Sequence, residues 1–76
     1  MITVKLYGLL RIESGIKEKQ LEAATVKDLL TALADCGIPE NKLNSCVILV
    51  NGNNTGKRSK LKDGDQVVLM SPVAGG

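Results

Sequence analysis

The residues with the most distinctive chemistry stand at the end of the sequence. The chain closes on Pro72-Val73-Ala74-Gly75-Gly76. Two successive glycines have no side chains, so they can pass through a narrow channel and present a bare terminal carboxylate. Glycine makes up about 7% of residues on average, so a terminal pair is uncommon by chance. The pattern predicts that the carboxylate of Gly76 reacts, on a tail over residues 71–76 that extends about 20 Å.

Two other motifs resemble reactive sites but lack a required residue. The segment Gly52–Ser59 has three residues between its glycines, where a phosphate-binding loop needs four, and Arg58 follows Lys57 in place of Ser or Thr. Cys36 and Cys46 lack Cys-x-x-Cys spacing, and the sequence has no histidine to activate a thiol. We interpret the segment as a hairpin loop, Cys46 as a small core residue and Cys36 as half-buried or inert.

Charge and composition exclude several classes of partner. The 76 residues carry ten basic and eight acidic side chains, a net charge of +2 that is too balanced to imply a polyanion. Four cations cluster at Lys57, Arg58, Lys60 and Lys62, but Tyr7 is the one aromatic residue, so the stacking surface of a nucleic-acid site is missing. We interpret the cluster as a solvated loop or a docking site for an acidic partner.

The same arithmetic bears on location and catalysis. The longest unbroken apolar run, Cys46–Val50, is far shorter than the ~20 residues of a membrane helix, and the first residues alternate instead of forming the apolar stretch of a signal peptide. We expect a soluble cytoplasmic protein with no membrane or nucleic-acid partner. With no histidine and two cysteines, we expect no metal or cofactor bound by the chain itself and no catalysis by the chain alone.

Apolar periodicity predicts the strands that must position the tail. Alternation from Ile2 indicates a strand with one buried face, which we expect to run to about Leu10 or Ile12. A weaker, charged edge strand is expected from about Ile16 to Ala23. Two segments are apolar on both faces, which predicts interior strands at Cys46–Val50 and Val67–Met70. A short strand is also considered around Lys57–Lys60.

One helix is clearly marked. Its apolar residues fall at i, i+3, i+4 and i+7, on one face: Val26, Leu29, Leu30 and Leu33. Thr25 is the predicted N-cap, with Asp28 three residues later as in a capping box. Gly37, with Pro39 beyond it, marks the end. One more short helical turn is considered for Pro39–Asn44.

The order of elements predicts an α+β fold. A hairpin, a helix and later strands form a β-grasp arrangement, a mixed sheet with one main helix on one face, in which the first and last strands lie side by side in the middle. We expect a β-grasp domain over residues 1–70 and a flexible tail over 71–76. The other sheet face is expected to be partly open. Val68, Met70 and Leu49 are its candidate docking residues, unless loops of the domain cover them.

The chain resembles the ubiquitin-like sulfur carriers, most closely the small subunit of molybdopterin synthase. The matching stretches are Met1–Arg11, Thr25–Leu30, Leu61–Val67 and Pro72–Gly76, of which the last two are specific. The thiamine-pathway carriers are similar but usually lack the Pro-Val step. This sequence departs from the common Phe-Pro-Pro-Val of the family, because Met70-Ser71-Pro72-Val73 stands there.

The resemblance implies a reaction and a set of partners. An E1-like activating enzyme would use ATP and magnesium to adenylate Gly76, with Gly75 giving access. A sulfur-donor protein would convert the adenylate to a thiocarboxylate. The large subunit of molybdopterin synthase would then receive the tail and pass the sulfur to a pterin precursor. The partner-binding residues implied are Leu49, Val68, Met70, Ser71, Pro72, Val73 and Ala74.

Three functions share this fold. The chain is a sulfur carrier for molybdopterin or another pathway such as thiamine synthesis, a ubiquitin-like modifier conjugated through Gly76, or a plain binding module with an accidental Gly-Gly end. Identification of the sulfur state of Gly76 separates the three.

Overall fold

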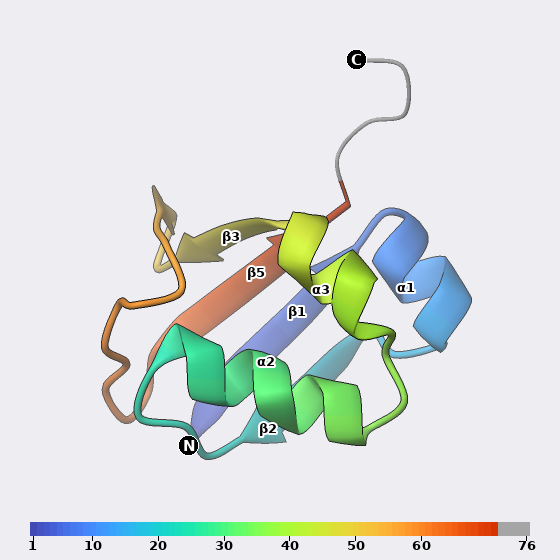
Figure 1. Cartoon of the computed structure of the whole chain (residues 1–76). Helices are drawn as coiled ribbons and strands as arrows, with labels where there is room; N and C mark the ends of the chain where they lie inside the picture. The colour runs from blue at the N-terminus through green and yellow to red at the C-terminus, as the bar shows by residue number, and fades with distance from the viewer. Residues whose placement is uncertain (72–76) are drawn as a thin grey trace.

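Five strands and three helices form the part of the chain that the structure describes. This computed structural model describes residues 1–71, and residues 72–76 lie outside it (Figure 1). The elements, in chain order, are β1 (Ile2–Tyr7), α1 (Leu9–Ser14), β2 (Glu18–Leu21), α2 (Val26–Asp35), α3 (Glu40–Ser45), β3 (Val47–Val50), β4 (Asn53–Asn54) and β5 (Gln66–Met70). They form one mixed sheet in the order β2-β1-β5-β3-β4, which confirms the predicted α+β, β-grasp arrangement.

The first and last strands lie side by side, as predicted. β1 and β5 are parallel, with Val4 opposite Val67 and Leu6 opposite Leu69, and β3 is antiparallel to β5. Alternation places every second side chain of β1 and β5 under α2. The side chains that these strands and β3 turn toward α2 are buried: Val4, Leu6, Ile48, Val67 and Leu69. Each such burial contributes roughly 1.5–3 kcal/mol to folding.

The capping signals of α2 act as the sequence predicts. The Thr25 hydroxyl accepts a hydrogen bond from the amide of Asp28 at 3.2 Å. At the other end, the amide of Gly37 donates to Ala34 (3.0 Å) and that of Ile38 to Leu33 (3.3 Å), the two bonds of a Schellman motif. Gly37 has a φ of 104°, which favours glycine. The apolar face predicted for this helix is buried, and the short turn expected after Pro39 is α3.

The first hairpin forms with β2 at the edge of the sheet, as predicted, but both of its strands are shorter than expected. β1 ends at Tyr7 instead of Leu10 or Ile12, because Gly8, at φ 67°, turns the chain out of the sheet. The residues that follow do not alternate, and they form α1 with Leu10 buried and Ile12 75% exposed. The second strand is shorter than expected and covers only Glu18–Leu21.

A tight hairpin, β3–β4, replaces the loop expected after residue 50. Asn51 (φ 51°) and Gly52 (φ 85°) both have positive φ, as a type I′ turn requires. The turn brings Asn53 opposite Val50, so the chain returns along β3 as the short strand β4. The strand considered around Lys57–Lys60 is not formed. An isolated bridge joins Lys60 to Thr25 there.

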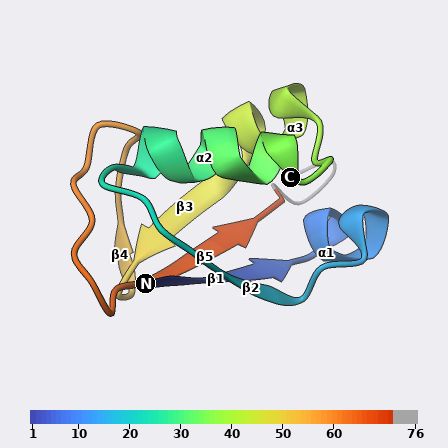
Figure 2. The ribbon, with the colours of Figure 1, turned by 90° about the horizontal axis from the view of Figure 1, so that it is seen from below.

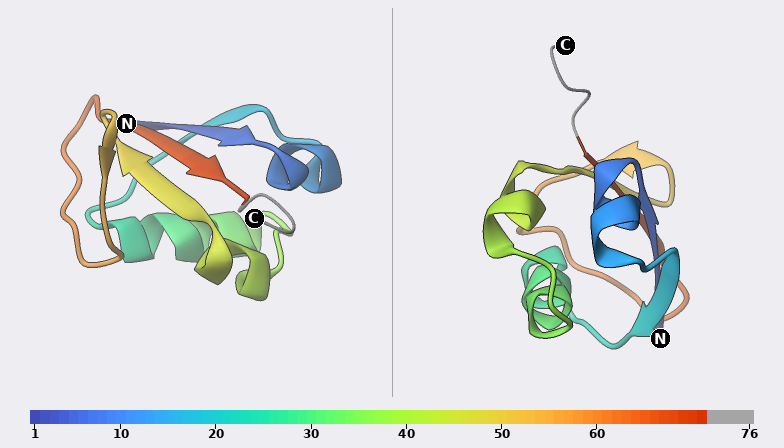
Figure 3. Two further views of the ribbon diagram at one scale, coloured as in Figure 1. Left: turned by 90° about the horizontal axis from the view of Figure 1, so that it is seen from above. Right: turned by 90° about the vertical axis from the view of Figure 1, so that its right-hand side faces the viewer.

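The helices are distributed unevenly over the sheet. α2 and α3 lie over one face, and α1 lies at the end of the sheet where β1 and β5 stop (Figures 2 and 3). Over residues 1–71 no helix lies on the opposite face. None of the helices described is long and apolar enough to cross a membrane.

Candidate functional site

The predicted tail begins at the edge of the sheet where β1 and β5 both end. The last pair of the parallel ladder is Tyr7 with Met70, and Val47, the first residue of β3, lies opposite Met70 on the other side. Ser71 follows immediately and is half-buried. Parallel strands end at the same edge, so the start of the tail is set by the two most central strands of the domain.

Two short helices flank this edge. A small cavity of about 170 Å³ lies between α1 and α3, lined by Leu9, Leu10, Glu13, Lys42, Ser45 and Ser71. An ion pair between Lys42 and Glu13 joins the two helices across it. The Ser71 hydroxyl accepts a hydrogen bond from the amide of Leu10 at 2.9 Å. The start of the tail is therefore in contact with α1.

The candidate docking residues of the domain come together on the uncovered face of the sheet. Leu49 pairs with Val68, and alternation puts Met70 on the same face as Val68. All three are half-buried and lie on the face away from α2. We call these residues, with Val47 and Tyr7, the open-face patch. The other predicted tail contacts, Pro72, Val73 and Ala74, lie outside the described residues, as do Gly75 and Gly76.

Val47 and Tyr7 were not among the predicted docking residues. Tyr7 is 43% exposed and lies beside Met70 in the parallel ladder. The alternation of β1 already assigns Tyr7 to the outer face, but its neighbour is set by a pairing more than sixty residues away along the chain. A charged pair, Lys5 with Glu18 at 4.0 Å, borders the patch next to Val68. The patch is thus apolar toward the tail and charged toward β2.

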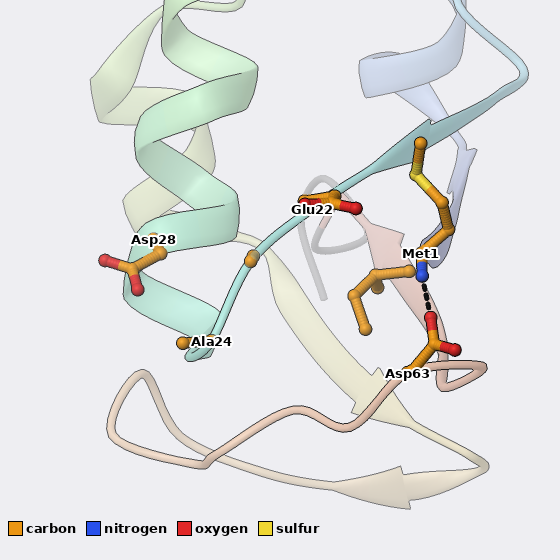
Figure 4. Close-up of a pocket in the computed structure, with 7 residues that line it drawn as sticks. Met1, Glu22, Ala24, Asp28 and Asp63 are labelled. Carbon is orange, nitrogen blue, oxygen red and sulfur yellow. Dashed lines mark hydrogen bonds and ion pairs between the residues drawn. The ribbon is translucent and has the colours of Figure 1, made fainter.

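A wide, shallow concavity of about 770 Å³ lies at the opposite end of the sheet. It is lined by Met1, Ile2, Glu22, Ala23, Ala24, Asp28 and Asp63. In Figure 4 the Met1 ammonium points at the Asp63 carboxylate, with which it forms an ion pair. The lining includes neither Ser71, where the tail begins, nor any of the predicted docking residues. We therefore place the candidate site at the Ser71 end.

The predicted turn before β5 is held by one carboxylate. Asp65 accepts hydrogen bonds from the amide of Lys62 (2.8 Å) and from the side-chain amide of Asn51 (3.0 Å). The bond from the Lys62 amide, and secondly that from Asn51, lower the pKa of Asp65 below its usual value. The amide of Gln66 in turn donates to the Asn51 side chain at 3.0 Å. Asp65 therefore joins the β3–β4 turn to the start of β5, which is a structural role.

Neither cysteine has the environment of a nucleophile. Burial raises the pKa of the Cys46 thiol, which donates to the carbonyl of Leu43 at 2.9 Å. A thiol with a raised pKa stays protonated and weakly reactive at neutral pH. Cys36 is exposed at the end of α2.

In the basic cluster, the Lys57 ammonium donates a hydrogen bond to the side chain of Asn44 at 2.6 Å, which connects the loop to α3.

Comparison with known proteins identifies relatives over the whole chain. The sequence model of the ThiS family matches residues 4–76. Among the curated proteins, none matches this sequence. The solution structure of small archaeal modifier protein 1 from Methanosarcina acetivorans superposes with a TM-score of 0.83 at 33% identity, over 99% of this chain and 95% of that one.

Two further solved structures are of complexes. A chain of the complex of subunits 1 and 2 of molybdopterin-converting factor from Helicobacter pylori matches with a TM-score of 0.75 at 26% identity, over 99% of this chain and 97% of that one. A chain of the BexX/CysO complex from Amycolatopsis orientalis matches with a TM-score of 0.74 at 26% identity, over the full length of both.

Proposed function

We propose that this chain, which belongs to the ThiS family of ubiquitin-like sulfur carriers, carries sulfur as a thiocarboxylate on Gly76 and donates it as the small subunit of a molybdopterin synthase. The observation that carries this proposal is the position of Ser71. The two central strands end together there, so residues 72–76 begin at the edge of a rigid sheet and beside an uncovered apolar patch. A domain built in this way can dock through one face while its terminus enters a partner.

The proposed chemistry activates a poor electrophile. The carboxylate of Gly76 attacks the α-phosphate of magnesium-bound ATP on an E1-like activating enzyme, which releases pyrophosphate and leaves an acyl-adenylate. A sulfide-level sulfur from a donor protein then attacks the acyl carbon and displaces AMP, so a thiocarboxylate remains. Its sulfur attacks the pterin precursor on the large subunit, and water then cleaves the acyl carbon–sulfur bond, which leaves the sulfur on the precursor and returns Gly76 to the carboxylate. ATP and magnesium belong to the activating enzyme in this scheme, and the cytoplasmic location expected from the sequence stays a prediction.

In this scheme the residues of this chain provide the length of the tail and the surface that docks on a partner. Counted from Ser71, residues 72–76 extend at most about 16–18 Å, at 3.3–3.6 Å per residue. Such a span is long enough to enter an active site only if the domain docks close to its mouth. The open-face patch adjoins the start of the tail through Met70, and it exposes apolar area on the face away from the helices. We infer that this patch is the docking surface for the activating enzyme and the large subunit.

Mass spectrometry of the intact chain tests the sulfur-carrier chemistry. We expect the chain, incubated with an activating enzyme, ATP, magnesium and a sulfur donor, to gain the mass difference between sulfur and oxygen at its terminus. Addition of the large subunit and the pterin precursor should return the mass to that of the carboxylate. The same experiment with the thiamine-pathway acceptor decides between the two pathways, because only the matching acceptor removes the sulfur.

A paired substitution tests the docking surface. Val68→Ser lowers the apolar area of the patch. Gln20→Ser is the control, because it shortens a side chain on the same sheet face without changing the patch, since Gln20 pairs with Thr3 away from it. We expect Val68→Ser to weaken binding of the large subunit about tenfold, as loss of a central apolar contact does, and Gln20→Ser to leave it unchanged. Equal affinities for the two variants would place the docking surface elsewhere.

A protein-modifier function is the second candidate. The observation that favours it is the 33% identity and TM-score of 0.83 to small archaeal modifier protein 1. In this function the activated Gly76 forms an amide with a lysine of another protein. Covalent ladders in the native cells that disappear when Gly76 is removed would support it, and their absence alongside a thiocarboxylate would leave the carrier function alone.

A further inference from the structure

The first turn of α1 has no side-chain cap from its own N-cap residue. Its N-cap is Gly8, which has no side chain to accept a hydrogen bond. The carbonyl of Gly8 accepts from the amides of both Arg11 (3.1 Å) and Ile12 (3.2 Å). The amide of Leu10 points away from that carbonyl and donates to the Ser71 hydroxyl at 2.9 Å, across 61 positions of sequence. A residue at the start of the tail therefore does the work of an N-cap for a helix near the beginning of the chain.

Gly8, the N-cap residue of α1, lies beside Ser71. A Cβ added to Gly8 would lie 3.7 Å from three atoms of Ser71, namely its backbone nitrogen, Cβ and Oγ. The parallel ladder ends one residue earlier on both strands, at Tyr7 and Met70. Beyond this pair, the Leu10–Ser71 bond takes over from the ladder in holding the two segments together.

We propose that Ser71 is a positioning residue for sulfur transfer, because its hydroxyl caps α1 and thereby fixes the point from which residues 72–76 begin. The inference rests on the proposed sulfur-carrier function. Without the bond, the last residue that a described contact holds to the domain is Met70, so the path from that contact to Gly76 gains one residue, about 3.3–3.6 Å. Reacting groups misplaced by ~1 Å can lose about a hundredfold in rate. The bond thus sets where residue 72 begins relative to the docked domain, without contacting the reacting atoms.

Three variants separate this role from simple helix stability. Ser71→Ala removes the acceptor. Ser71→Thr keeps a hydroxyl at the same position. Ser14→Ala weakens the other end of α1, since the Ser14 hydroxyl donates to the carbonyl of Leu10 at 2.6 Å and accepts from the amide of Ile16 at 3.1 Å. Ser14 has no contact with Ser71 among the bonds of this region, so it is the matched control.

The measurements are hydrogen exchange of the Leu10 amide and single-turnover sulfur transfer to the large subunit. In Ser71→Ala we expect Leu10 to exchange about fivefold faster, the equivalent of one lost N-cap. We expect transfer at saturating large subunit to slow by about three- to tenfold, while the dissociation constant of the complex changes less than about twofold. Ser71→Thr should restore both the exchange and the transfer rate.

Each other outcome counts against the inference. Wild-type transfer by Ser71→Ala removes the positioning role and leaves the carrier function intact. Equal slowing by Ser14→Ala attributes the effect to α1 stability instead of to the start of the tail. A wild-type chain that never acquires or donates sulfur overturns the proposed function and the positioning role together, and Leu10 exchange then still reports whether the cap forms.

Discussion

The two ends of the central strand pair are held in different ways. Where β1 and β5 begin, backbone bonds and charges fasten the chain: the amide of Thr3 donates to Asp65 (3.1 Å), the amide of Gly64 to Met1 (2.9 Å), and the Met1 ammonium pairs with Asp63. Where the same strands end, a single side-chain bond from Leu10 to Ser71 continues the contact.

We infer from this difference that the starting end contributes mainly to the stability of the domain and the finishing end to the binding of a partner. At the starting end, the side chain of Asp65 accepts hydrogen bonds from Lys62 and Asn51, and its carbonyl accepts one from the amide of Thr3. This end contains no candidate reacting group among the described residues. The finishing end has the uncovered apolar patch and the start of the tail. A sulfur carrier must keep its fold while a partner binds its tail. The contacts at the starting end help to stabilise the domain, so the finishing end is available to bind a partner.

The largest expected effect removes the core beneath both ends. Leu29 lies on the inner face of α2 and is fully buried, so Leu29→Asp would place an unpaired carboxylate among apolar side chains. We expect a loss of roughly 4 kcal/mol or more, close to the whole stability of a domain of this size, so the variant should show no cooperative unfolding transition. Thr31→Asp, on the exposed side of the same helix, is the control and should remain folded. A folded Leu29→Asp would mean that α2 is not in this register.

The next largest effect abolishes activation of the Gly76 carboxylate and leaves the fold unchanged. Deletion of Gly76 withdraws the carboxylate by about 3.3–3.6 Å, and Gly75→Val adds a branched side chain where backbone must pass closely. We expect both to abolish ATP–pyrophosphate exchange with the activating enzyme. Thermal unfolding should be unchanged, since no contact that holds either end of the β1–β5 pair is removed. A shortened chain that is activated as well as the full one would contradict the carrier function.

The smallest effect loosens the starting end alone. Asp65→Asn removes the charge that two hydrogen bonds favour, so we expect a modest fall in the midpoint of urea unfolding at neutral pH with sulfur loading unchanged. Because folding lowers the pKa of Asp65, its contribution is present above the usual carboxyl pKa and is lost as pH falls through the lowered value. The gap between wild type and Asp65→Asn should therefore close in acid. A gap that persists in acid would contradict this role for the Asp65 charge.

Local signals predicted the parts of the fold that depend on local physics. α2 was found because its apolar face, its Thr25 cap and its Gly37 end all lie within a few residues of one another. The interior strands followed from β-branched runs. The Asn51-Gly52 pair is the strongest short hairpin signal, and it could have indicated β4.

Non-local contacts explain what was missed. Nothing near Leu9 marks a helix, because the N-cap is a glycine and the cap hydroxyl of Ser71 lies at the other end of the chain. Tyr7 joins the docking patch only through its parallel pairing with Met70, which no periodicity reveals. The carrier chemistry depended on residues 75 and 76, which no element of the domain predicts.

The parallel alignment of β1 and β5 also determines how the domain responds to mechanical force. The chain enters β1 at Ile2 and leaves β5 at Met70, at opposite ends of one ladder. A pull between these points runs along the strands, so it loads the interstrand hydrogen bonds in shear and all at once, whereas a hairpin pulled at its open end separates one bond at a time. A force applied to the tail while the start of β1 is held is therefore resisted by all the hydrogen bonds of the β1–β5 ladder together. The domain then stays folded and moves with its tail.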